Sequence, residues 1–199
     1  MIEIEKKFAL SDKDQERLIQ GAQFLKEKIF TDVYYDTTDL ALTTNDKWLR
    51  SRDGKFELKL SLRRGTDRLA DQYDELEDEE SIKHALGLDV DGDLADLLAA
   101  NGYSPFVTIT TVRTKYHKDG FGIDLDAIDF GDYTHHICEI ELMVEDQSEI
   151  DNAIERIINF AKEQGLTVGP VRGKVVEYLK KANPTHYWAL VNADVVKDF

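Results

Sequence analysis

The sequence has one cysteine, three prolines and no long apolar run. A single cysteine, Cys138, cannot form an internal disulfide, which excludes a small domain held together by disulfides. No stretch approaches the roughly 20 apolar residues that a membrane-spanning helix needs. The chain opens on charged residues without an apolar leader segment. These absences predict a soluble, cytoplasmic protein that does not bind membranes.

Basic residues are scarce relative to acidic ones. The 199 residues include 25 Lys and Arg against 40 Asp and Glu, which gives a formal net charge of −15. This surplus repels the phosphate backbone of nucleic acids, so we expect no nucleic-acid partner. A polyanionic small molecule would bind only where basic side chains or a divalent cation reverse the local charge.

The remaining composition is typical of a globular protein. Hydrophobic residues make up 42% of the chain and charged residues 33%, and there are only twelve glycines. The length favours one large domain over two small ones, and no linker or repeat divides the chain. We therefore expect a single domain over residues 1–199, and a monomer.

Much of the chain has the period-2 alternation of β-strands. Residues 2–10 and 30–36 carry this pattern. Residues 47–62 contain two such runs around Asp53-Gly54, a dipeptide typical of hairpin turns. Three further runs, which predict an antiparallel meander, cover residues 106–117, 121–130 and 135–144.

Helices are expected between and after these strands. Ser11 and Asp14 have the spacing of a capping box, which predicts a short helix that ends near Gly21. Residues 148–164 place isoleucines at helical spacing, with Ser148 as the expected N-cap. Other helices are expected in two pieces over residues 80–101, and beyond residue 173.

Charged residues stand two apart on strand after strand. Period 2 places the members of each set on one face of the sheet. On a single strand, such a face is most simply a solvent-exposed surface. That explanation does not account for doubled like charges, which are expected to repel each other without internal relief. The sets are Glu3, Glu5 and Lys7; Arg50 and Arg52; Glu57 and Lys59; Asp124 and Asp126; and Glu139 and Glu141.

The doubled carboxylates predict a bound cation. Hard divalent cations prefer oxygen ligands, and Mg²⁺ is usually held by one or a few carboxylates together with water and substrate phosphates. We therefore expect Mg²⁺ as the cofactor, with Mn²⁺ as the alternative. The number of ions stays open.

Basic residues complement this acidic set. Arginine binds phosphate oxygens in a bidentate manner, and bases from separate elements would converge only if the strands close around a cavity. A cavity with acids on one side and bases on the other would hold a polyphosphate as its metal complex. The bases are Lys7, Arg50, Arg52, Lys59, Arg113 and Lys174.

These segments resemble, in order, those of the CYTH superfamily, the triphosphate tunnel metalloenzymes. The opening Glu3-x-Glu5-x-Lys7 is similar to the superfamily signature, and the similarity extends to Gly173-Lys174. The segments between look most like those of the animal thiamine triphosphatases. They are Tyr34-Tyr35-Asp36-Thr37, Trp48-Leu49-Arg50-Ser51-Arg52, Glu57-Leu58-Lys59, Asp124-Leu125-Asp126, Asp129-Phe130-Gly131 and Glu139-Ile140-Glu141.

The resemblance implies an α+β fold in which an eight-stranded antiparallel β-tunnel, a closed barrel, is flanked by helices. It also implies Mg²⁺-dependent removal of the terminal phosphate of a small-molecule triphosphate. Carried over by position, the six bases named above would bind phosphate. Glu3, Glu5, Asp124, Asp126, Glu139 and Glu141 would hold metal or orient the attacking water, and the expected catalytic residues are Glu3, Glu5, Lys59 and Tyr34.

Three roles stay open on the sequence. Arg113 rests on a short match, and Lys115 lies on the same strand face as a substitute. Glu75 either joins the acidic set or is one of several surface acids around it. Tyr34 is either an ordinary strand aromatic or a residue at the tunnel mouth near the leaving group.

Trp48 separates the candidate substrates. Alternation places its ring on the Arg50 and Arg52 face, where an indole can hold a thiazolium cation by stacking and cation–π attraction. The alternative is a core residue. Since tripolyphosphate has no group to stack, the sequence favours thiamine triphosphate as the substrate. The other candidates are an inorganic triphosphatase, a cyclase that forms cyclic AMP from ATP, and a non-catalytic polyphosphate-binding module, which the intact acidic set disfavours.

Overall fold

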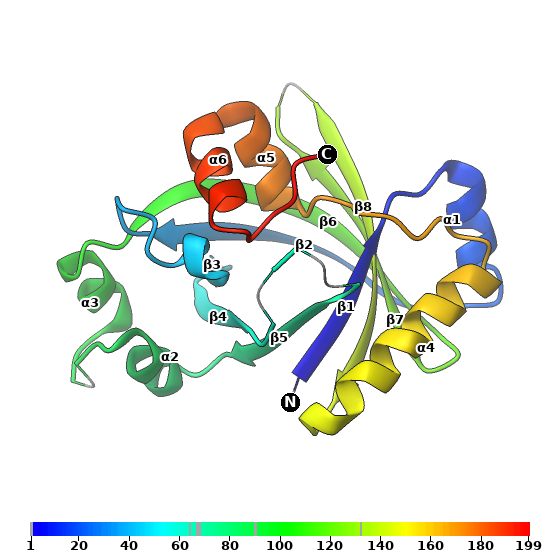
Figure 1. The fold of residues 1–199 in the computed structure, drawn as a ribbon, viewed down its shortest axis with the longest axis horizontal. Coiled ribbons are helices and arrows are strands. Elements are labelled where there is room, and N and C mark those ends of the chain that lie inside the picture. The colour runs from blue at the N-terminus through cyan, green and yellow to red at the C-terminus, as the bar shows by residue number, and fades with distance from the viewer. Residues whose placement is uncertain (1, 64, 67–68, 90, 132) are drawn as a thin grey trace.

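The computed structural model describes residues 2–63, 65–66, 69–89, 91–131 and 133–199. Eight antiparallel strands form a closed barrel in the order β1-β5-β4-β3-β2-β6-β7-β8 (Figure 1). This confirms the expected α+β fold with an eight-stranded antiparallel tunnel. The strands are β1 (Ile2–Phe8), β2 (Gln23–Asp36), β3 (Lys47–Arg52), β4 (Lys55–Ser61), β5 (Asp71–Leu76), β6 (Ser104–Lys118), β7 (Phe121–Asp129) and β8 (Thr134–Val144).

The barrel wall is apolar outside and charged inside. In β1, Ile4 is fully buried in a cluster with residues of α4 (Ile150–Glu163), whereas Glu3 and Glu5 line the interior cavity. In β3, Leu49 packs outward and Arg50 inward. Because strand side chains alternate between the two faces, one period-2 pattern supplies both the core and the charged lumen.

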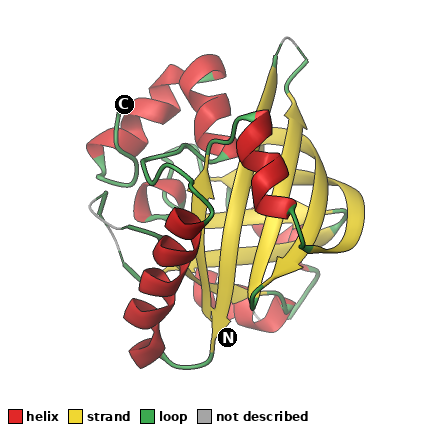
Figure 2. Cartoon of the chain, turned by 90° about the vertical axis from the view of Figure 1, so that its right-hand side faces the viewer, coloured by secondary structure: helices red, strands yellow, loops and turns green. Residues whose placement is uncertain are grey.

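Three apolar clusters attach the helices to the barrel, and Figure 2 shows the helices around it. The first and third clusters lie on the outer face of the wall, whereas the second is formed with inward-facing strand residues such as Tyr34 and Val107. The first cluster packs α1 and α4 against β1, β7 and β8. The second packs α5 and α6 against β2, β6, β7 and β8, and the third packs α2 and α3 against β3 and β4. The helices are α1 (Asp12–Ile19), α2 (Glu79–Leu86), α3 (Leu94–Ala100), α4 (Ile150–Glu163), α5 (Lys174–Ala182) and α6 (Pro184–Asn192). None of the helices in the described ranges combines the length and the apolar character needed to cross a membrane.

Two predicted boundaries are wrong. The strand expected at residues 30–36 begins at Gln23, and its first seven residues pair with β6. Both faces of residues 23–29 are exposed to solvent, so this part of the strand has no buried face and its sequence shows no alternation of apolar and polar residues. The expected N-cap Ser148 lies inside a 3-10 turn, η2 (Gln147–Glu149). The carboxylate of Asp146 caps this turn instead, and accepts the backbone N–H of Ser148 at 2.7 Å. The capping box of Ser11 with Asp14 is confirmed.

Candidate active site

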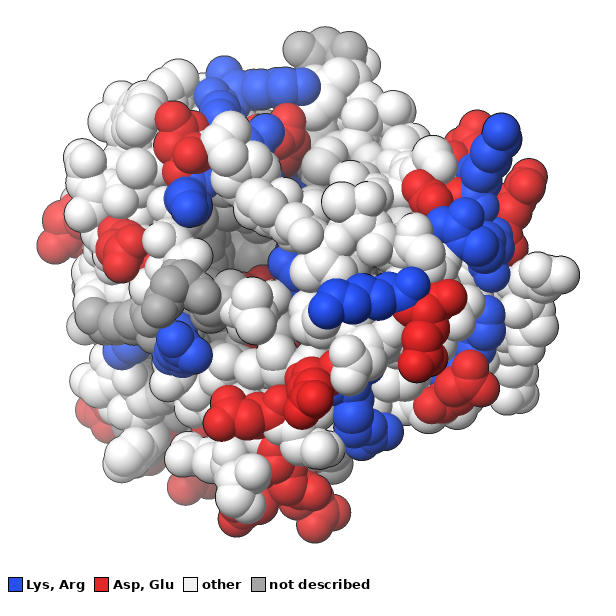
Figure 3. Space-filling model, turned by 45° about the vertical axis from the view of Figure 1, so that its right-hand side comes forward, with Lys and Arg blue, Asp and Glu red and all other residues white. Residues whose placement is uncertain are grey.

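A cavity of about 400 Å³ lies in the barrel interior. The molecule is hollowed on this side, and side chains of both charges surround the opening (Figure 3). The wall consists of inward-facing residues of seven strands together with the start of α5 and the segment that follows α6. The predicted site residues on this wall are Glu3, Glu5, Lys7, Tyr34, Trp48, Arg50, Arg52, Lys59, Arg113, Glu139, Glu141 and Lys174, and the open candidates Glu75 and Lys115 lie there as well.

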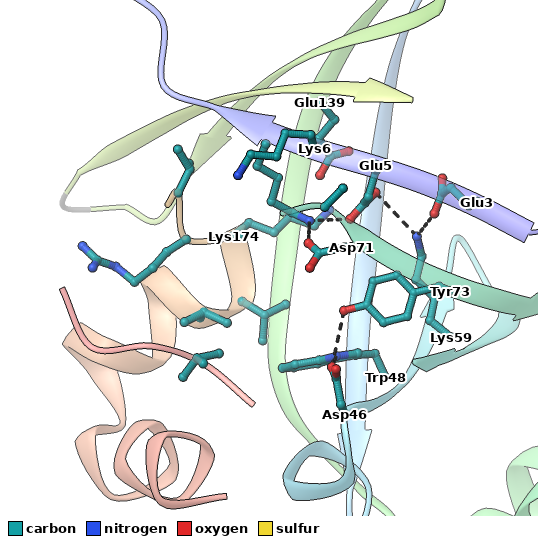
Figure 4. Close-up of a pocket in the computed structure, with 18 of the residues that line it drawn as sticks. Glu3, Glu5, Lys6, Asp46, Trp48, Lys59, Asp71, Tyr73, Glu139 and Lys174 are labelled. Atoms are coloured by element: carbon teal, nitrogen blue, oxygen red, sulfur yellow. Dashed lines mark hydrogen bonds and ion pairs between the residues drawn. The ribbon is translucent and has the colours of Figure 1, made fainter. Parts of the chain in front are cut away.

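The acids of β1 are paired with lysines (Figure 4). Lys59 of β4 hydrogen-bonds to Glu3. Lys7 hydrogen-bonds to Glu5 and, at 2.7 Å, to Asp71 of β5. Lys7 of the same strand and Lys59 of β4, which lies beyond β5, thus neutralise the doubled carboxylates of β1, and the expectation that these carboxylates lack internal relief is wrong.

Burial and these ion pairs shift the pKa values of the β1 acids in opposite directions. Burial raises the pKa of Glu3 to about 8, even with the Lys59 ammonium beside it. Burial acts on Glu5 too, but Lys7 and Lys59 outweigh it, so the pKa of Glu5 lies below its ordinary value. For Lys59, burial is outweighed by Glu5 and Glu3, and its pKa is raised. At neutral pH Lys59 is therefore a fixed cation, and Glu3 is a carboxyl group that can exchange a proton.

Arg113 of β6 binds three carboxylates of the neighbouring strands. Its Nε and Nη2 donate to the two oxygens of Asp126, both at 2.6 Å, and its Nη1 donates to Asp124 Oδ2 at 2.5 Å. Nη2 also donates to Glu139 Oε2 at 2.7 Å. Asp124 and Asp126 are buried next to this guanidinium and do not line the cavity. Their role as metal ligands stays a prediction, whereas their contacts make them counterions of Arg113.

The two glutamates of β8 differ in electrostatic environment. Burial acts on Glu139, but the Arg113 guanidinium outweighs it and brings the pKa of Glu139 down to about 2. Burial and the neighbouring Asp124 raise the pKa of Glu141 above its ordinary value. Glu141 fills space that Gly122 of β7 leaves open, since a Cβ on Gly122 would lie 2.6 Å from Glu141 Cγ. Glu139 is thus held as a carboxylate by neighbouring bases, whereas the negative charge of an ionised Glu141 is less well balanced by nearby bases.

Asp32 of β2 is the counterion of the basic wall, although the sequence pattern did not single it out. Its carboxylate accepts hydrogen bonds from Arg52 Nε at 2.7 Å and from Lys174 Nζ at 2.5 Å. Burial is outweighed by these bases, so the pKa of Asp32 is lowered. Asp32 stands two residues before Tyr34 on the same strand, so period 2 was the signal that placed it inside the barrel.

Tyr34 is both a packed strand aromatic and a residue of the cavity wall, while its place near a leaving group stays a prediction. Its ring packs at 6.3 Å from that of Phe106, within the cluster under α5 and α6. The residue also lines the cavity, where its hydroxyl interacts with Arg50. Arg50 Nε in turn donates to Glu57 Oε2 at 2.7 Å. Tyr34 is therefore a packed aromatic whose polar end reaches the site.

Trp48 faces the cavity, as alternation predicts. Its indole N–H donates to Asp46 Oδ1 at 2.9 Å, and the Tyr73 hydroxyl lies 3.4 Å from the same oxygen (Figure 4). The neighbouring Leu49 is fully buried on the opposite face. One edge of the indole is thus fixed, and its ring forms part of the cavity wall.

The acids on the wall fit a divalent cation that binds together with a substrate. Within the described ranges, no three His, Cys, Asp or Glu side chains form a ready-made metal cage. Mg²⁺ does not require one, because it is commonly held by one or two carboxylates with phosphate oxygens and water. Glu3, Glu5, Glu139 and Glu141 present carboxyl groups to the cavity. In addition, Asp124 Oδ1 is a buried oxygen with no hydrogen-bond partner among the described residues.

A protein-family match, a sequence relative and similar solved structures were found for this chain. Residues 1–169 match the CYTH domain family. The chain is 30% identical to human thiamine-triphosphatase over 213 aligned residues, which cover 98% of this chain and 91% of that protein. Its fold is similar to that of the PH1819 protein from Pyrococcus horikoshii OT3, with a TM-score of 0.66, 22% identity, and coverage of 90% of this chain and 99% of that one. A protein from Hippeastrum, described as a putative adenylyl cyclase with a dominant triphosphatase activity, has a TM-score of 0.55 at 17% identity and covers 92% of this chain and 97% of its own.

Proposed function

Because this chain belongs to the CYTH domain family, we propose that it is a metal-dependent triphosphatase whose substrate is thiamine triphosphate. The observation that carries the proposal is the cavity, where bases and acids from separate strands converge beside an indole. The similarity to human thiamine-triphosphatase over almost the whole chain supports the choice of organic substrate.

The bases of the cavity would bind the phosphates. A triphosphate carries its negative charge on oxygens that arginine forks bind in pairs. Arg50 and Arg52 lie side by side on β3, while Lys7 and Lys174 approach from β1 and α5. Phosphoryl transfer to water depends mainly on positioning and on neutralising charge around the terminal phosphate, and this arrangement supplies both.

The acids would hold the metal and handle the proton. Mg²⁺, when bound by Glu5, Glu139 and Glu141 with the substrate, would supply further charge neutralisation and activate the attacking water. In its ionised form Glu3 would accept a proton from that water, and its raised pKa makes this carboxylate a stronger base than an ordinary glutamate. Lys59 carries a fixed positive charge beside Glu3 and orients it. Tyr34, next to Arg50, would donate a hydrogen bond to the departing diphosphate.

The organic end of the substrate would lie against Trp48. A thiazolium ring is a delocalised cation, and an indole face attracts cations. The indole N–H donates to a carboxylate, which places negative charge close to the ring. Both features favour a cationic organic group over tripolyphosphate, which has no group to place there.

Product analysis tests this proposal. Purified protein with Mg²⁺ and thiamine triphosphate should release thiamine diphosphate and inorganic phosphate in equal amounts, as separated by chromatography. Formation of thiamine monophosphate and pyrophosphate would place the cut at the wrong bond. Release of cyclic AMP and pyrophosphate from ATP would favour the cyclase, and binding without turnover would favour a non-catalytic module.

A further inference from the structure

We propose that Asp32 and Phe30 form a buried platform that positions Arg52 and Lys174 for the triphosphate, a role that rests on the proposed function. The two residues stand two apart on β2, so both point into the barrel. Asp32 is 0% exposed and Phe30 is 2% exposed, and neither lines the cavity. They therefore act through the bases above them and do not touch substrate.

The carboxylate of Asp32 binds one edge of the Arg52 guanidinium. Arg52 Nε donates to Oδ1 at 2.7 Å and Nη2 donates to Oδ2 at 3.1 Å. A guanidinium has five N–H groups, and the contact with Asp32 uses two of them. Three N–H groups therefore remain to donate hydrogen bonds to a phosphate. Asp32 fixes the direction of Arg52 without exhausting its donors.

The same carboxylate orients Lys174. Its Nζ lies 2.5 Å from Asp32 Oδ2 and 3.3 Å from Thr111 Oγ1. An ammonium has three N–H groups, so one remains for a ligand. A single buried anion thereby fixes one base from β3 and one from α5, elements that are far apart in the sequence.

The ring of Phe30 packs against the charged ends of both bases. Its ring centroid lies 4.1 Å from Arg52 Cζ and 4.9 Å from Lys174 Nζ, both within the range of cation–π attraction. Arg113 Cζ lies 5.6 Å away, at the outer limit. An aromatic face attracts cations while carrying no net charge, so Phe30 gathers the bases without repelling a polyanion.

This arrangement predicts that kcat and KM respond differently when Asp32 loses its charge. Asp32→Asn removes the anion that orients two bases, so the terminal phosphate would be held loosely and kcat should fall about ten- to a hundredfold. The substitution also removes one negative charge close to the bound triphosphate. KM should therefore not rise.

Thermal unfolding in the presence of tripolyphosphate provides a readout that does not depend on turnover. Without ligand, Asp32→Asn should melt at a lower temperature than the native protein, because buried cations lose their counterion. Tripolyphosphate should then raise the melting temperature of the variant by more than it raises that of the native protein, because it replaces the missing anion. Asp53→Asn is the matched control, since it removes the same charge from the exposed β3–β4 turn and should leave kcat, KM and the ligand shift unchanged.

The outcomes separate this inference from the proposed function. If the native protein hydrolyses thiamine triphosphate but Asp32→Asn keeps its kcat, or raises KM at constant kcat, the platform is refuted and the function stands. If no triphosphate is hydrolysed, the ligand shift alone decides, and equal shifts in variant and native protein refute the platform. Should Asp32→Asn fail to fold, Phe30→Leu tests the same platform with Asp32 intact. It should lower kcat severalfold without raising KM, and an unchanged kcat in a folded Phe30→Leu would overturn the inference.

Discussion

Replacing Trp48 with alanine should distinguish organic from inorganic triphosphates. The ring lies on the cavity wall next to Arg50 and Arg52, where the organic end of a bound triphosphate would emerge. Stacking of a thiazolium cation on an indole contributes about 1 to 2 kcal/mol. Since about 1.4 kcal/mol corresponds to a tenfold change, Trp48→Ala should lower kcat/KM for thiamine triphosphate roughly tenfold.

The assay compares two substrates on the same variant. Tripolyphosphate contacts only the bases, so its kcat/KM should change by less than about threefold in Trp48→Ala. Because damage to folding or to metal binding lowers both activities together, the ratio of the two values isolates the contribution of the ring. Steady-state phosphate release in saturating Mg²⁺ gives both numbers.

Leu49→Ala is the matched control for this comparison. Leu49 is the next residue of β3 but is fully buried on the outer face, against residues of α2 and α3. The cavity left in the core should lower the free energy of unfolding by about 2 to 5 kcal/mol and leave the ratio of the two kcat/KM values unchanged. An equal loss on both substrates in Trp48→Ala would refute the reasoning, because Trp48 would then be a structural residue and an inorganic triphosphatase would be the better account.

Three further predictions follow from the acidic half of the site. Chelation with excess EDTA should abolish phosphate release, and Mg²⁺ or Mn²⁺ should restore it. Ca²⁺ should restore it poorly, because its larger and looser coordination shell would misplace the phosphate. Full activity in EDTA would show that the reaction does not need a metal. Glu139→Gln and Glu141→Gln should each reduce kcat severely, but only the first should lower stability in urea. The pKa of Glu139 is depressed to about 2, so its ionised form contributes stability that is present above about pH 4.5 and is lost as pH falls toward 2, whereas the pKa of Glu141 is raised. Gly122→Ala keeps every carboxylate but forces Glu141 out of its position, so kcat should fall while the midpoint of unfolding changes little; wild-type turnover would show that the position of Glu141 is unimportant.

The charged inward faces of the strands could be predicted because strand alternation is a local property, whereas the eight-stranded barrel was expected only from the family resemblance. Each inward set, such as Glu3 with Glu5, was visible as a spacing of two in the sequence. The same spacing predicts Trp48 inside and Leu49 outside, where the structure places them. Helix boundaries with strong capping residues, such as Ser11, were equally local.

The pairing of charges could not be predicted, because it depends on which strands become neighbours. Arg113 meets Asp126 only because β6 pairs with β7 in this register. Lys59 meets Glu3 across β5, which lies between β4 and β1. A single sequence gives no strand order, so the doubled acids were expected to repel each other when in fact neighbouring bases neutralise them. Asp32 was missed for a related reason, since an acid between two aromatic residues, Phe30 and Tyr34, on one strand face carries no local sign of the bases that surround it.

The most direct test of the central claim is one comparison of kcat/KM. Purified protein in Mg²⁺ should be assayed for phosphate release from thiamine triphosphate, tripolyphosphate and ATP, each over a full range of concentrations. A site that binds phosphates with its bases and a cationic organic group with Trp48 should give the highest kcat/KM on thiamine triphosphate. A higher value on tripolyphosphate or on ATP would contradict the claim.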